Sequence, residues 1–168
     1  MVECQQFAQG LAALREAFDI GSQAGWRLSY PEFMGSFALA LAGLGRVDEA
    51  HDAVCKAIDA AGVREDGDQW YVPELLRIKG EVLLRQTSDQ AGQAAADCFA
   101  QAAEMARAQG ALSWELRVAL SHAGLLRGQG RSAEAMEVLQ PIYDRVTEGS
   151  DTTDLRSARA LLNTLRHT

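Results

Sequence analysis

Apolar residues along this 168-residue chain recur at intervals of three and four positions, the period of one face of an α-helix. Val and Ile, which favour strands, are scarce, whereas Ala and Leu, which favour helices, are abundant. Glycines in short polar joints, at Gly45, Gly62, Gly110 and Gly130, mark expected helix ends. The pattern predicts helices at residues 3–23, 31–44, 46–61, 72–86, 90–109, 113–128, 132–147 and 152–166.

One segment of the chain recurs. LAGLGRVDEAHDAVCKAI at 41–58 matches LLRGQGRSAEAMEVLQPI at 125–142, and a third copy at 83–103 has a longer joint. A small residue opens each copy, including a half copy at the start of the chain, in steps of 40, 45 and 40: Gly10, Ala50, Ala95 and Ala135. Three tryptophans repeat in steps of 44 and 44: Trp26, Trp70 and Trp114. A fixed interval of this length is typical of stacked structural repeats.

Small side chains at repeated positions allow two antiparallel helices to pack closely. We expect such notches in the second helix of each hairpin, at Ala50, Ala57, Ala95, Ala102 and Ala135, facing Ala38, Gly80 and Ala123. The predicted fold is all-α, a superhelix of about eight helices that forms one domain over residues 1–168. It comprises a half repeat at 3–23, hairpins at 31–61, 72–109 and 113–147, and a C-terminal capping helix at 152–166. The capping helix has one apolar stripe and a charged opposite face.

The hairpins resemble the tetratricopeptide repeat, although their spacing exceeds the usual interval of that family. More specifically, PELLRIKGEVLL at 73–84, the segment 114–143 and TEGSDTTDLRSARALLNTL at 147–165 resemble the C-terminal helical-repeat region of bacterial predicted ATPases. In that family a class III adenylate or guanylate cyclase domain, or a DNA-binding regulator domain, often precedes an ATPase domain. The resemblance implies a C-terminal sensor or interaction module of a larger signal-transducing ATPase, with all catalytic motifs outside this segment.

The charge and hydropathy of the chain narrow the range of partners. A formal net charge of -7 argues against binding a nucleic-acid backbone. No unbroken apolar stretch is long enough to suggest a membrane helix, and the N-terminus lacks the features of a signal peptide, so we expect a cytoplasmic chain with no membrane partner. The chain also begins abruptly inside an expected helix, which favours a piece of a longer protein. Cys4, Cys55 and Cys98 are too widely spaced to suggest a metal site or a disulfide framework.

No catalytic, metal or cofactor site is predicted. His51, His122 and His167 stand apart from one another, and no phosphate-binding loop or nucleophile elbow occurs. The Gly-x-Gly pairs at 43–45 and 128–130 follow helices, so we interpret them as turns. The tryptophans are interpreted as packing between repeats, with a binding platform as the alternative.

A binding surface is expected on the concave face, which first helices line in solenoids of this type. Charged side chains there are suited to holding the carboxylate of a partner; the alternative is that these charges are solvated and paired with one another. The expected face comprises Glu32, Leu39, Glu74, Arg77, Glu81, Arg85, Arg117 and Arg127.

These observations predict a non-catalytic interaction module that binds a protein segment, another domain of its parent or a second copy of itself. The alternative is a sensor of a small molecule or peptide that controls an attached ATPase or cyclase; a deep apolar pocket would favour this sensor. We expect a homodimer through apolar residues of the first helix, which would lack an upstream partner: Phe7, Leu11, Leu14 and Phe18.

Overall fold

The computed structural model describes residues 2–23, 30–62, 68–147 and 152–167. These residues form eight α-helices and one 3₁₀ turn, and no strand lies among them. The helices are α1 (Val2–Gln23), α2 (Tyr30–Gly43), α3 (Val47–Gly62), α4 (Val72–Leu83), α5 (Ala91–Ala108), α6 (Leu112–Gly128), α7 (Ser132–Arg145) and α8 (Thr153–Leu165), with the turn η1 (Asp68–Tyr71) before α4. The all-α prediction is confirmed.

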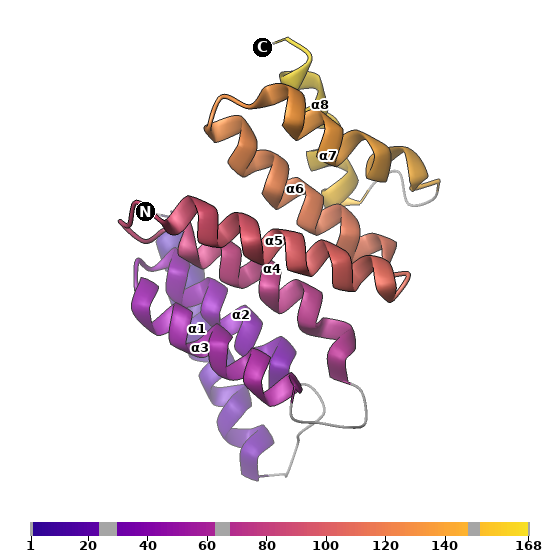
Figure 1. The fold of residues 1–168 in the computed structure, drawn as a ribbon. Helices are drawn as coiled ribbons and strands as arrows, with labels where there is room; N and C mark the ends of the chain where they lie inside the picture. The colour runs from indigo at the N-terminus through magenta and orange to yellow at the C-terminus, as the bar shows by residue number, and fades with distance from the viewer. Residues whose placement is uncertain (1, 24–29, 63–67, 148–151, 168) are drawn as a thin grey trace.

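The helices stack as antiparallel pairs along the length of the molecule (Figure 1). Helices α2 and α3, α4 and α5, and α6 and α7 form the three hairpins, and each second helix also packs on the first helix of the next hairpin. The first helices α2, α4, α6 and α8 pack on one another in succession. This arrangement is the predicted superhelix of helical hairpins, with α1 at one end and α8 at the other.

Small residues bring the paired helices together. The predicted notches Ala50, Ala57, Ala95, Ala102 and Ala135 are all fully buried, as are Ala38 and Ala123 opposite them. Helices α4 and α5 approach closely at Gly80, where an added Cβ atom would collide with the ring of Phe99. Only glycine fits there because the aromatic ring fills the space that a side chain would need.

The turns follow the predicted glycines. Gly45, Gly110 and Gly130 have φ angles of +77°, +65° and +75°, in the left-handed region that glycine adopts without strain. At the start of α8 the side chain of Thr152 accepts a capping hydrogen bond from the N–H of Leu155.

The buried apolar side chains form two clusters. The first cluster contains residues of the five helices from α1 through α5, together with Val118 of α6. The second cluster contains residues of α6, α7 and α8. Helix α6 therefore faces both clusters, with Val118 in one and Ala119 in the other. Within the described ranges, no helix is both long and apolar enough to traverse a bilayer.

Candidate functional site

A buried ion-pair network occupies the face formed by the first helices. Glu74 of α4 is 1% exposed, and it accepts two hydrogen bonds of 2.8 Å from the Nε and Nη2 atoms of Arg77. Its Oε1 atom also lies 2.8 Å from Nη2 of Arg117 on α6. One buried carboxylate thus holds two guanidinium groups from two successive repeats.

The network continues beyond this centre. Nη1 of Arg77 donates to Oγ of Ser121 at 3.2 Å and lies 3.6 Å from Oε1 of Glu81. Nε of Arg117 lies 3.8 Å from a carboxylate oxygen of Asp154 on α8. Burial by itself lowers the pKa of Arg77, but the hydrogen bonds and charge of Glu74 together with the charge of Glu81 raise it, and the net effect is a raised pKa. The network links α4, α6 and α8, so its charges serve contacts between repeats.

Aromatic rings lie beside this network. The rings of Trp70 and Trp114 lie 6.3 Å apart between centroids, and Tyr71 packs edge-on against both. The guanidinium of Arg117 lies 5.4 Å from the ring centre of Trp114. Burial and the charge of Glu74 raise the pKa of Tyr71 to about 12. Two of the three repeated tryptophans therefore meet at a junction between repeats; Trp26 lies outside the described residues.

The other residues of the predicted concave face do not join the network. Glu32 is half-buried and its charge contributes to raising the pKa of Tyr71, while Leu39 packs against the first apolar cluster. Arg85 donates to the backbone oxygen of Ala42 at 3.4 Å, and Arg127 is exposed at the far end of α6. The structure thus brings together four of the eight predicted residues, and they are paired with one another.

The first helix turns part of its apolar face inward. Leu11 is 5% exposed and belongs to the first cluster, and the ring of Phe7 lies against Gly43 of α2. Leu14 is half-buried, and the side chain of Phe18 lies outside the described part of the chain. Two of the four residues expected to mediate self-association therefore already pack within this chain.

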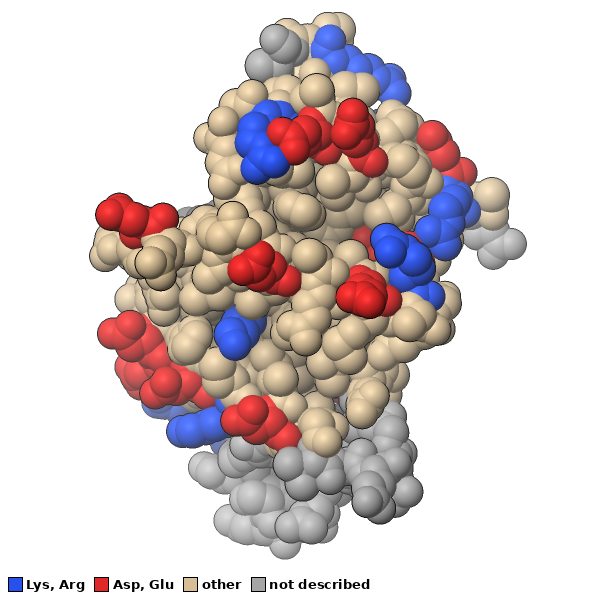
Figure 2. Space-filling view, in the orientation of Figure 1, with Lys and Arg blue, Asp and Glu red and all other residues tan. Residues whose placement is uncertain are grey.

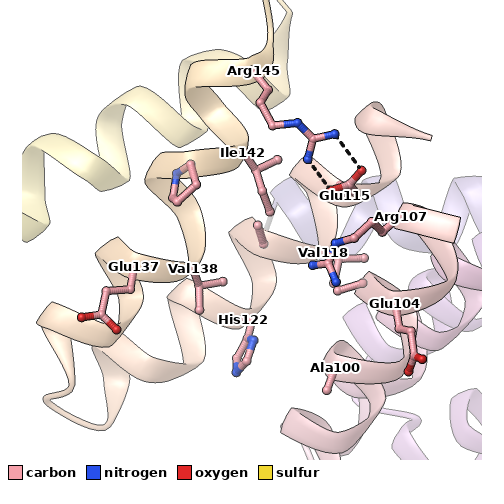
Figure 3. Close-up of a pocket in the computed structure, with 13 residues that line it drawn as sticks. Ala100, Glu104, Arg107, Glu115, Val118, His122, Glu137, Val138, Ile142 and Arg145 are labelled. Atoms are coloured by element: carbon pink, nitrogen blue, oxygen red, sulfur yellow. Dashed lines mark hydrogen bonds and ion pairs between the residues drawn. The ribbon is translucent and has the colours of Figure 1, made fainter. Parts of the chain in front are cut away.

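A second candidate site lies on the opposite side of α6. Helices α5 and α7 both pack on α6 without packing extensively on each other, and the space between them is a groove with a volume of about 620 Å³ (Figure 3). Its floor comes from α6, and its two walls come from α5 and α7. The groove is lined by Ala100, Ala103, Glu104, Arg107, Glu115, Val118, Ala119, His122, Glu137, Val138, Pro141, Ile142 and Arg145.

The groove follows the boundary between the two apolar clusters. Val118 belongs to the first cluster, and Ala119, Val138 and Ile142 belong to or pack on the second. The small side chains of Ala100, Ala103 and Ala119 leave the space open. Figure 2 shows this hollow as largely uncharged surface between α5 and α7, with acidic and basic side chains around it.

Arginines gather at one end of the groove. Glu115 is 1% exposed, and its carboxylate receives hydrogen bonds of 2.8 Å and 3.3 Å from Nη1 and Nη2 of Arg145. The side chain of Arg145 is 53% exposed. Arg107 approaches the same end from the last turn of α5 (Figure 3). This end therefore has two guanidinium groups and one buried carboxylate.

The other end of the groove is acidic. Glu137 of α7 lies there with His122 of α6, and Glu104 lies on the α5 wall (Figure 3). Burial and the charge of Arg131 lower the pKa of His122, which favours the neutral imidazole. Pro141 has no N–H group, so the helix bond that the carbonyl of Glu137 would receive from residue 141 cannot form. Both Glu137 groups, carboxylate and carbonyl, are hydrogen-bond acceptors.

This groove was not among the predicted sites. Its signals were available: a proline inside an otherwise regular helix, and small residues on the outward side of α5. These signals were not sufficient to predict the groove, because its shape depends on the relative positions of three helices.

No family model matches the chain, and comparison with curated proteins gives no match. In the part of the chain that the structure describes, no group of three or more His, Cys, Asp or Glu side chains is arranged to hold a metal ion.

Proposed function

We propose that this chain is a non-catalytic protein-interaction module, and that the groove between α5 and α7 receives a short segment of a partner protein. The observation that carries this proposal is the groove itself. It has an apolar floor and charged residues at both ends, and it lies on a stack of tightly packed helices. A rigid surface of this kind limits the entropy that is lost on binding.

The groove suits a partner better than the concave face does. On the concave face, Glu74 already occupies the guanidinium groups of Arg77 and Arg117. A carboxylate from a partner would have to displace a buried carboxylate whose hydrogen bonds are already made, which is costly. In the groove, by contrast, Arg107, Glu104 and Glu137 are exposed.

The resemblance to repeat regions of bacterial signalling ATPases supports a regulatory setting for this interaction. In that setting the partner segment belongs to another domain of the same parent or to a separate protein of the pathway. A second copy of this chain is the remaining option, and the exposed Ile20 on α1 gives it some support.

A second candidate function is the sensing of a small effector molecule. One observation favours it: a volume of about 620 Å³ lies within the range of roughly 300 to 1,000 Å³ that is typical of small-molecule sites. The two functions share the groove and differ in its occupant.

Selection of peptides from a phage-displayed library of random sequences tests the proposal. We expect enrichment on the wild-type chain and loss of binding in Ala100→Trp, because the indole would fill the groove from its α5 wall. Ala108→Trp is the matched control, since Ala108 is an exposed alanine of the same helix that does not line the groove. Failure to enrich any peptide, or equal binding by both variants, would contradict the proposal.

A further inference from the structure

We infer that the groove selects a segment with opposite charges at its two ends: an extended, apolar stretch flanked by one carboxylate side chain and one basic side chain. The carboxylate lies at the end formed by Arg107 and Arg145, and the basic side chain lies near Glu137. This inference rests on the proposed function and specifies the chemistry of the partner.

The arginine end has hydrogen-bond donors to spare. A guanidinium group carries five N–H donors, and Arg145 directs only its Nη1 and Nη2 atoms at Glu115. Among the described residues, the side chain of Arg107 forms no hydrogen bond or ion pair. With two positive groups and one negative group, this end has a net positive charge, and a second carboxylate would balance it.

The opposite end offers acceptors. The carboxylate of Glu137 forms no ion pair with the described residues, and the carbonyl of Glu137 lacks its helix bond because of Pro141. Neutral His122 adds no positive charge there. An ammonium or guanidinium group on the partner supplies the donors and the charge that these groups lack.

The spacing of the two ends sets the length of the segment. Glu137 and Arg145 are eight residues apart along α7, which corresponds to about 12 Å of helix axis. An extended chain crosses this distance in three or four residues at about 3.3 Å each. The side chains between the two charges would lie on Val118, Ala119 and Ile142, so they should be apolar.

The experiment repeats the peptide selection with Arg107→Glu and compares the enriched sequences with those from wild type. The wild-type chain should enrich peptides in which an acidic and a basic residue lie about three or four positions apart in the sequence, with largely apolar residues between them. The variant should instead enrich a basic residue in place of the acidic one. Arg127→Glu is the matched control, because Arg127 is exposed on α6 and lies outside the groove.

Binding measurements with an altered peptide then test which protein side chain the acidic residue contacts. Replacing the acidic residue of a selected peptide by glutamine should weaken binding to wild type and to the Arg127→Glu control by about two- to fivefold, and should not weaken binding to Arg107→Glu. Enriched peptides without this charge pattern, or a glutamine effect that Arg107→Glu leaves unchanged, would overturn the inference while leaving the groove as a binding site. A selection that enriches nothing would overturn both.

Discussion

The two charged surfaces that border α6 differ in what their charges contact. On one side, Arg117 pairs with the buried carboxylate of Glu74 and lies near Asp154, so the charges hold successive repeats together. On the other side, the groove leaves Arg107 and Glu137 exposed at its opposite ends. Similar residue types thus contribute to stability on one face and remain accessible to a partner on the other. The arrangement of neighbouring helices, more than the residue type, decides between these roles.

The largest difference between the two surfaces should appear in stability. Glu74→Ala leaves two guanidinium groups without their buried partner, and we expect the free energy of unfolding to fall by about 3 kcal/mol or more. Glu104→Ala in the groove should change it by less than about 0.5 kcal/mol, since Glu104 is exposed. Urea unfolding measures both values, and similar losses for the two variants would refute the distinction.

Two glycine positions should differ in their effect on stability, and this difference should be smaller than the first. Gly80→Ala would place a methyl group against the ring of Phe99 and should cost about 1–3 kcal/mol of stability. The matched variant Gly124→Ala adds a methyl group in open space within α6 and should stabilise by about 0.5–1 kcal/mol. Thermal unfolding of the two variants tests this, and a stabilising Gly80→Ala would show that the α4–α5 contact is looser than described.

A third effect concerns pH on the network side. The pKa of Tyr71 is raised from 10.0 to about 12, so the fold favours the neutral phenol. The resulting stability is present below pH 10 and is lost as the pH rises towards 12. In Tyr71→Phe this loss should diminish. Urea unfolding across that range measures it, and an identical pH dependence in both proteins would contradict the assignment.

Sequence reasoning predicted the helices closely because their signals are local. The glycines at 45, 110 and 130 ended helices as expected, and the buried alanines marked the packed faces. The 3₁₀ turn at Asp68–Tyr71 was not predicted. Its tyrosine packs against Trp114, which is 43 positions away, and contacts at that range leave little trace in local sequence.

The candidate sites were harder to predict. The sequence placed Glu74, Arg77, Glu81 and Arg117 on one face, and the structure brings them together. It left open whether they pair with one another or with a partner, because that depends on the distance between α4 and α6. The groove was missed altogether, since it arises where α5 and α7 do not pack against each other.

A partner segment should occupy the groove while the ion-pair network around Glu74 remains internal. Hydrogen–deuterium exchange with and without a peptide selected on the wild-type chain tests it most directly. We predict added protection in residues 100–107 and 137–145, the two walls of the groove. Protection confined to α2, α4 and α8 would contradict this account, because it would place the partner on the face that holds the Glu74 network.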